Sequence, residues 1–374
     1  MAQGKLGFGC MRLPVMESGE IDHEEFCRMV DLFLEKGFTY FDTSYVYHNG
    51  KSESAVREAL VKRYPRESYT IATKFPTFAI TGADRDKVEG IFEQQLVNCG
   101  VDYFDYYLLH NLNEPRYEEI CKPCGLFEFI SEKKKAGIIK NIGFSFHDSA
   151  EVLDWILTEH PEIDFVQIVI NYYDWNSYVI QSKECYEVAR RHGKQVVVME
   201  TVKGGMLANV PGEAQELMRK MQPGLSDASW AVRFASGLDG ILAVLSGMSN
   251  YSQVEDNISY MQNFVPMTEE EKNICFDTAS LIRKKGPVGT ADYSNYENVS
   301  QKGLPAAALL DTWTAMASQP NPYFGAEGNY YSLLRYHYNA PDGEWVRSGL
   351  KAADGTDITE LIRQADAYVS EHAF

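Results

Sequence analysis

Two short runs, Thr70-Ile-Ala-Thr-Lys74 and Phe104-Asp-Tyr-Tyr-Leu-Leu-His110, enclose a longer stretch, Asp86–Val97, in which apolar residues recur every three or four positions. The runs are rich in apolar and β-branched residues, which predicts two strands joined by an amphipathic helix. A helix between two strands lets the strands run parallel. This stretch therefore predicts an α/β fold.

The same unit repeats along the chain from Lys5 to about Met261. Eight strand-and-helix units in about 260 residues match a closed (β/α)8 barrel, a TIM barrel, better than an open doubly wound sheet. Helical spacing also marks His23–Glu35, Ser52–Lys62 and Ser149–Thr158. The other six predicted strands are Leu6–Cys10, Thr39–Phe41, Lys140–Phe144, Phe165–Ile170, Gln195–Met199 and Ile241–Leu245.

The composition changes after the eighth unit. A charged stretch of helical period, Met267–Lys285, ends at Gly286-Pro287, and the following residues are rich in aromatic residues, Gly and Pro. A last amphipathic stretch covers Ile358–Val369. We therefore expect a barrel over residues 1–285 and a C-terminal extension, partly helical and partly irregular, over residues 286–374.

The charge of the chain excludes some partners. Lys and Arg total 35 against 53 Asp and Glu, a net charge of −18, which repels nucleic-acid phosphates and anionic membrane surfaces. No apolar run approaches the ~18 residues that a membrane-spanning helix needs. Seven scattered cysteines without a secretory segment are typical of reduced thiols. We expect a cytoplasmic protein that binds neither nucleic acid nor membrane.

Titratable side chains stand where successive strands end, the position at which barrel enzymes carry their sites. Asp42 follows the second strand, Lys74 ends the third, His110 ends the fourth, and Tyr47 lies five residues after Asp42. A lysine ammonium beside a tyrosine favours the phenolate and brings the tyrosine pKa toward neutral pH. Asp42 could orient Lys74, and His110 could direct a substrate oxygen. Together with Tyr47, these residues could deliver a proton to a carbonyl.

Four motifs resemble the aldo-keto reductase superfamily: Leu6-Gly-Phe-Gly-Cys-Met-Arg-Leu-Pro14, Phe41-Asp-Thr-Ser-Tyr-Val-Tyr-His-Asn-Gly-Lys-Ser-Glu53, Ile71-Ala-Thr-Lys74 and Asp105-Tyr-Tyr-Leu-Leu-His110. The resemblance covers roughly residues 5 to 285. It implies an NAD(P)H-dependent carbonyl reductase or alcohol dehydrogenase acting on a small aldehyde, ketone or sugar-like substrate. It also implies Tyr47 as general acid.

The resemblance further suggests contacts to the nicotinamide end of NAD(P)H. Ser145 and Gln167 match the family positions that hold the carboxamide, and Gly9, Cys10 and Met11 border the ring at the end of the first strand. Phe146 stands where the family commonly has Asn after the serine, and Asn171 could replace that amide. Met199 stands where the family has a stacking aromatic residue, and its sulfur can pack on a ring face.

The segment Leu245–Asn257 resembles the family's adenosine-phosphate loop. A 2′-phosphate calls for Lys or Arg, but Gly247, Met248 and Gln253 occupy the usual basic positions, followed by Asn257. These residues favour NADH over NADPH. Lys203 could instead reach the pyrophosphate or the ribose.

Two alternatives remain open: a nicotinamide-sensing regulatory subunit, and an electron-transfer oxidoreductase. Relatives with a similar Phe144–Asp148 segment often carry a C-terminal ferredoxin-like tail with iron–sulfur cysteines, and Asp357–Arg363 resembles the segment after them. No cysteine follows Cys275, so the tail is a degenerate one and we expect no iron–sulfur cluster and no metal. Substrate identity, reaction direction and oligomeric state stay open.

Overall fold

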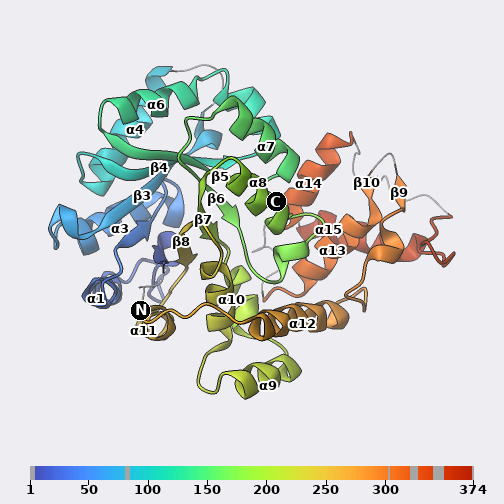
Figure 1. Cartoon of the computed structure of the whole chain (residues 1–374). Helices are drawn as coiled ribbons and strands as arrows, with labels where there is room; N and C mark the ends of the chain where they lie inside the picture. The colour runs from blue at the N-terminus through green and yellow to red at the C-terminus, as the bar shows by residue number, and fades with distance from the viewer. Residues whose placement is uncertain (1–4, 81–84, 302–303, 321–326, 340–348, 373–374) are drawn as a thin grey trace.

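The computed structural model describes residues 5–80, 85–301, 304–320, 327–339 and 349–372. Eight parallel strands close into a barrel in the chain order β1 to β8, and helices surround it (Figure 1). The predicted (β/α)8 barrel is confirmed. Its strands are β1 (Leu6–Gly9), β2 (Tyr40–Asp42), β3 (Thr70–Phe75), β4 (Phe104–Leu112), β5 (Ile139–Phe146), β6 (Phe165–Val169), β7 (Gln195–Met199) and β8 (Ile241–Ser246).

The helices alternate with the strands, and the last ones form the extension that Figure 1 shows beside the barrel. The helices up to residue 285 are α1 (His23–Glu35), α2 (Tyr47–Gly50), α3 (Ser52–Val56), α4 (Arg85–Cys99), α5 (Glu114–Arg116), α6 (Leu126–Lys135), α7 (Ala150–Glu159), α8 (Ser182–Arg191), α9 (Gly212–Met221), α10 (Asp227–Ser236), α11 (Tyr251–Met261) and α12 (Glu269–Lys285). The extension contains the strands β9 (Ser300–Gln301) and β10 (Leu304–Pro305) and the helices α13 (Ala306–Ala317), α14 (Glu327–His337) and α15 (Thr359–His372).

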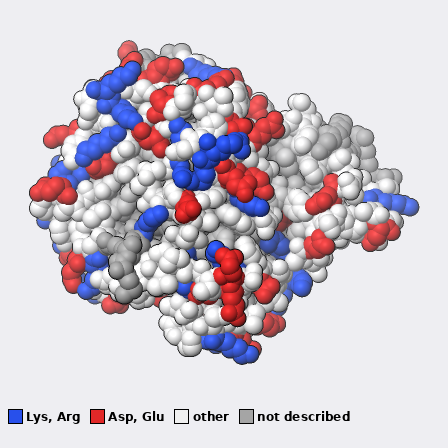
Figure 2. All heavy atoms as spheres, in the orientation of Figure 1, with Lys and Arg blue, Asp and Glu red and all other residues white. Residues whose placement is uncertain are grey.

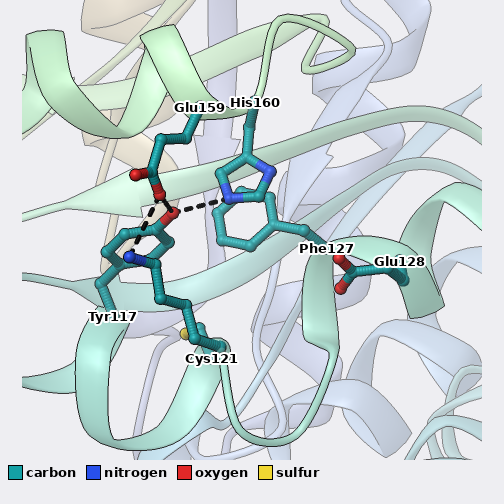
Figure 3. A pocket seen from close by; sticks show the side chains of 7 residues that line it. Tyr117, Cys121, Phe127, Glu128, Glu159 and His160 are labelled. Carbon is teal, nitrogen blue, oxygen red and sulfur yellow. Dashed lines mark hydrogen bonds and ion pairs between the residues drawn. The ribbon is translucent and has the colours of Figure 1, made fainter.

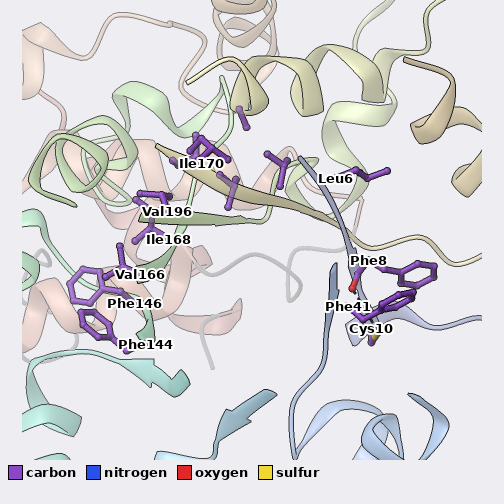
Figure 4. Packing of buried hydrophobic residues seen from close by; sticks show 14 of the residues in the cluster. Leu6, Phe8, Cys10, Phe41, Phe144, Phe146, Val166, Ile168, Ile170 and Val196 are labelled. Carbon is purple, nitrogen blue, oxygen red and sulfur yellow. Dashed lines mark hydrogen bonds between the residues drawn. The ribbon is translucent and has the colours of Figure 1, made fainter. Parts of the chain in front are cut away.

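Helix α1 shows how the local sequence sets an element. The Asp22 carboxylate accepts a hydrogen bond from the Glu25 backbone nitrogen at 3.0 Å and so caps the helix N-terminus. Helical spacing then places Phe26 and Phe33 on one buried face. Both rings pack against Phe8 of β1. Phe8 also stacks on Phe41 of β2 with centroids 5.6 Å apart (Figure 4). The outward side chains of the strands thus bind the helices to the barrel.

Close strand approach depends on glycine at one position of the barrel wall. Gly143 of β5 pairs with Phe165 of β6, and a Cβ atom at Gly143 would lie 2.5 Å from the Phe165 carbonyl oxygen. A side chain there would force the two strands apart, because backbone atoms cannot give way. Glycine therefore keeps the barrel closed between β5 and β6.

The extension has its own apolar cluster, built from residues of α13, α14, α15 and the segments before them. It also contacts the barrel near the ends of β6 and β7. Tyr330 of α14 and Ala308 of α13 share a buried cluster with Val169 and Met199. The Tyr330 hydroxyl donates to the Phe146 carbonyl oxygen at 3.3 Å. The extension therefore covers one side of the barrel end that carries the predicted site.

An ion-pair contact holds α14 to the loops after β4 and β5. His337 Nε2 lies 3.0 Å from an Asp148 oxygen, and His337 Nδ1 lies 2.6 Å from a Glu114 oxygen. The Asp148 hydrogen bond, and to a lesser extent Glu114, raises the pKa of His337 above its usual value, although burial opposes it. The protonated imidazole therefore binds both carboxylates.

We expect this contact to stabilise the docked extension at acidic rather than alkaline pH. Because the folded-state pKa of His337 is raised, its contribution is complete below the unfolded pKa of about 6.5 and is lost as pH rises through the folded pKa. The variant His337→Gln should lose about 1 kcal/mol at pH 5.5 and much less at pH 9. Thermal unfolding of both proteins at the two pH values measures this, and an equal loss at both would contradict it.

The charged side chains are mixed on the face shown in Figure 2, where Lys and Arg lie among Asp and Glu. Among the described helices, none combines the length and the apolar character that crossing a bilayer requires.

Candidate active site

Strand register brings the polar strand ends to one end of the barrel. Asp42 of β2 pairs with Ala72 of β3, and Lys74, two residues further on, pairs with Leu108 of β4. His110 lies two residues beyond Leu108. Since side chains alternate along a strand, Ala72 and Lys74 point to the same side, as do Leu108 and His110. Parallel register therefore gathers Asp42, Lys74 and His110.

Lys74 is the most enclosed member of this group. Its side chain has no exposed surface, and its ammonium lies 2.5 Å from Asp42 Oδ1 and 2.8 Å from the Thr43 carbonyl oxygen. Burial alone would lower the pKa of Lys74, but Asp42 and Tyr47 raise it above its usual value. Lys74 therefore carries its positive charge inside the barrel.

Tyr47 opens α2 and lies over Lys74, whose Nζ is 4.8 Å from the centre of the ring. Burial raises the pKa of the Tyr47 hydroxyl above 10, and Lys74 lowers it only in part. The expected downward shift of this pKa is therefore not found, because removal from water disfavours the phenolate more than one ammonium favours it. Tyr47 keeps its proton at neutral pH.

His110 completes the group. Its ring lies edge-on to Tyr47 with centroids 5.8 Å apart. Burial, followed by the charge of Lys74, lowers the pKa of His110 well below its usual value, so the imidazole is neutral. Its Nδ1 lies 3.1 Å from Ser44 Oγ, and Thr77 Oγ1 donates to its carbonyl oxygen at 2.6 Å. The Ser44 contact orients the ring, the Thr77 contact holds the backbone of His110, and Nε2 bonds to neither residue.

The residues predicted to hold the nicotinamide amide lie on neighbouring strands. Ser145 of β5 pairs in register with Gln167 of β6. Gln167 Nε2 contacts the Met199 sulfur at 3.6 Å, but the buried Gln167 Oε1 has no hydrogen-bond partner among the described residues. An amide oxygen without a partner fits a carboxamide N–H donor. Ser145 Oγ accepts a hydrogen bond from the Asn111 backbone nitrogen at 2.7 Å.

Gly9 ends β1, and Cys10 and Met11 follow it directly. A Cβ at Gly9 would lie 3.1 Å from the Ser246 carbonyl oxygen of β8, so glycine permits a close approach at this end. Cys10 is buried, and burial raises the pKa of its thiol. The Met11 side chain is 55% exposed. Their proposed contacts to a cofactor stay predictions.

The segment predicted to bind the adenosine end divides into exposed and enclosed residues. Gly247 is exposed and packs against the Arg12 side chain, whereas Met248 is fully buried. Gln253 lies at the surface, where its side-chain oxygen accepts from the Ser249 backbone nitrogen at 2.7 Å. Asn257 is buried, and its amide donates to Ser246 Oγ at 2.8 Å.

Asn171 and Lys203 lie in one buried network rather than at an open surface. The Lys203 ammonium binds both oxygens of Asp174, at 2.7 and 2.8 Å. The Asn171 amide donates to Asp174 at 2.7 Å and to the Glu200 carbonyl oxygen at 3.1 Å. The structure thus gives both side chains a role in joining the loops after β6 and β7, because burial requires polar groups to find protein partners.

Several side chains at this end were not predicted from the sequence. Ser44, in the loop with Tyr47, contacts His110. His147 follows β5, and burial, then Arg116 and Lys74, lowers its pKa to about 4. Tyr330 of the extension packs edge-on against His147 at 5.8 Å. The unusual Phe146-His147 pair in the sequence could have pointed to His147 as a site residue. The positions of Tyr330 and Arg116 near His147 depend on tertiary structure.

A cavity of about 380 Å³ lies elsewhere, among helices outside the barrel (Figure 3). The Tyr117 hydroxyl at its wall donates to Glu159 and lies 2.8 Å from His160 Nε2. No residue predicted for the active site borders it. Its lining consists of Tyr117, Cys121, Lys122, Phe127, Glu128, Glu159 and His160.

Comparisons with known proteins find similarity in sequence and in fold. A probable aldo-keto reductase 1 from Glycine max is 33% identical over 151 residues, which cover 38% of this chain and only 41% of that protein. The holo form of aldo-keto reductase AKR11C1 from Bacillus halodurans superimposes with a TM-score of 0.59 at 22% identity, covering 74% of this chain and 93% of that one.

A Klebsiella pneumoniae aldo-keto reductase in complex with NADPH superimposes with a TM-score of 0.60 at 16% identity, covering 75% of this chain and 96% of that one. At these identities, the structural matches show the shared fold. The model of the aldo/keto reductase family matches residues 5–277, which include all eight strands and the four residues predicted to be catalytic. The chain therefore belongs to the aldo/keto reductase family and is an NAD(P)H-dependent enzyme.

Proposed function

We propose that the enzyme reduces a small aldehyde, ketone or sugar-like carbonyl, with Tyr47 as the general acid. The observation that supports this most strongly is the buried Asp42–Lys74 pair beneath the Tyr47 ring. A protonated hydroxyl over a fixed positive charge can release its proton as negative charge grows on a substrate oxygen. A regulatory subunit would not need this arrangement.

The four residues have distinct tasks in this proposal. When bound, a reduced nicotinamide would supply the hydride that the carbonyl carbon accepts. The Tyr47 hydroxyl hydrogen-bonds to the carbonyl oxygen and gives it a proton, so that the product is an alcohol. Lys74 stabilises the phenolate that remains, and Asp42 holds Lys74 in place. Neutral His110, with Nδ1 toward Ser44, donates a hydrogen bond from Nε2 and orients the carbonyl.

Residues of this chain fit the nicotinamide cofactor. The unpartnered Gln167 amide oxygen and the neighbouring Ser145 hydroxyl would hold its carboxamide, and Gly9, at the end of β1, would border the ring. We also propose that residues 286–374 form a subdomain that closes one side of this site through Tyr330. In this proposal the subdomain shapes the pocket and transfers no electrons.

The cofactor preference is a separate prediction. Met248 is buried and Gln253 is neutral, so we expect kcat/KM with NADH to exceed that with NADPH. A panel of aldehydes, ketones and sugars, followed by the loss of absorbance of reduced nicotinamide, tests both the activity and the preference. A large preference for NADPH would contradict the prediction and would point to Arg12, whose side chain packs against Gly247.

A further inference from the structure

A phenylalanine and an arginine lie next to the catalytic histidine, on segments that follow β3 and β4. The Phe78 ring has its centroid 5.7 Å from that of His110 and is 44% exposed. The Arg116 guanidinium carbon lies 5.3 Å from the Phe78 ring centre. The three side chains form a series that leads from the exposed surface to the site where a carbonyl would bind.

The local sequence holds Arg116 at this place. Helix α5 begins directly after β4, and the Asn113 side chain caps it by accepting from the Arg116 backbone nitrogen at 3.0 Å. Arg116 Nη1 then donates to the Asn111 carbonyl oxygen at 3.1 Å. Nη1 is the only nitrogen of this side chain that forms a hydrogen bond within the described part of the chain. The edge of the guanidinium that carries Nε and Nη2 can therefore bind both oxygens of a carboxylate.

The charges around Arg116 make an anion the fitting partner. Among the described residues, no Asp or Glu oxygen lies within 4.0 Å of its guanidinium. The charge of Lys74 is already balanced by Asp42. Burial lowers the pKa of Arg116, and Arg116 in turn contributes to the lowered pKa of both His110 and His147, which places its charge close to both rings.

A half-buried cation that has no carboxylate partner among the described residues of an otherwise acidic protein gains free energy when a ligand supplies the anion. We infer that Arg116 binds a carboxylate of the substrate, so that the enzyme selects aldehydes or ketones bearing an acid group a few bonds from the carbonyl. This inference about Arg116 rests on the proposed carbonyl reduction and adds a substrate class to it.

The test compares two aldehydes of equal carbon number, 4-oxobutanoate and butanal, at neutral pH and low salt. The wild-type enzyme should use the acidic aldehyde with a kcat/KM about 10 to 100 times that for butanal, and Arg116→Gln should remove most of this ratio, mainly through KM. Arg116→Lys should restore part of it. Added salt should reduce the ratio in the wild type.

The control is Arg219→Gln, which changes an exposed arginine on α9 and should leave the ratio unchanged. Equal use of both aldehydes by the wild type, or an unchanged ratio in Arg116→Gln, would overturn the inference while butanal turnover still supports the proposed function. If neither these aldehydes nor any member of the panel of aldehydes, ketones and sugars reacts, the proposed function fails.

A binding experiment tests whether Arg116 holds the carboxylate without requiring turnover. Calorimetry of 4-oxobutanoate with a Tyr47→Phe protein should show binding in the presence of nucleotide. The same protein carrying Arg116→Gln should bind it about 10 to 100 times more weakly. Equal affinity in the two proteins would overturn the inference whether or not the enzyme turns over.

Discussion

Replacing Tyr47 by Phe is expected to lower kcat for carbonyl reduction about 100- to 10,000-fold, the range that loss of a general acid typically costs. The variant keeps an aromatic ring over Lys74, 4.8 Å from Nζ, and removes only the hydroxyl. Nucleotide affinity should change little, because the residues proposed to hold the carboxamide lie on β5 and β6. Steady-state kinetics and titration of nucleotide fluorescence measure the two effects.

The matched control is Tyr45→Phe, which removes a tyrosine hydroxyl from the same loop and should leave kcat within about twofold. If Tyr47→Phe retained wild-type turnover, the general-acid assignment would be wrong.

Because burial raises the pKa of Tyr47, the donor stays protonated through neutral pH. We therefore expect the wild-type kcat for reduction to stay level from pH 6 to pH 8 and to fall only at alkaline pH.

Replacing Asp311 by Ala is expected to reduce the free energy of unfolding by about 3–5 kcal/mol. This carboxylate of α13 is 2% exposed, and its Oδ2 accepts from Ser177 Oγ at 2.7 Å and from the Tyr178 backbone nitrogen at 3.0 Å. Its Oδ1 lies 3.5 Å from Nε of Arg283, which is buried in α12. The substitution leaves a buried guanidinium without this carboxylate and two donors without their acceptor.

Urea unfolding measures the total loss, and hydrogen exchange shows where it occurs. Exchange should accelerate most in α13 and α15, because Asp311 ties the extension to the loop after β6. Asp311→Asn keeps an acceptor and should lose less. The control Asp277→Ala lies on the exposed side of α12 and should stay within about 0.5 kcal/mol of the wild type. An equally small effect of Asp311→Ala would contradict the proposed docking role.

Periodicity predicted most of the barrel elements closely. The predicted helix His23–Glu35 matches α1, and the predicted strand Gln195–Met199 matches β7. Each is set by local signals, such as the Asp22 cap or an uninterrupted run of valines, which packing then reinforces. In the extension, by contrast, only the last helix was predicted, because α13 is buried almost all round and lacks an amphipathic stripe.

The proposed catalytic group could be inferred from residue order because parallel strands bring their ends together. The cofactor contacts were harder to place. Lys203 was a candidate for the pyrophosphate, yet its ammonium binds Asp174 inside the protein. Sequence spacing does not show whether a long side chain turns to solvent or to a carboxylate 29 residues away.

The sequence by itself determined the alternation of strands and helices, the closure into eight units and the strand-end positions of Asp42, Lys74 and His110, since these follow from side-chain period and chain order. Only the tertiary structure decided the protonation of Tyr47, the position of Tyr330 over the barrel end and the absence of a carboxylate beside Arg116 in the described part of the chain. Those properties depend on burial and on distances between segments far apart in the chain, and neither is encoded in local spacing.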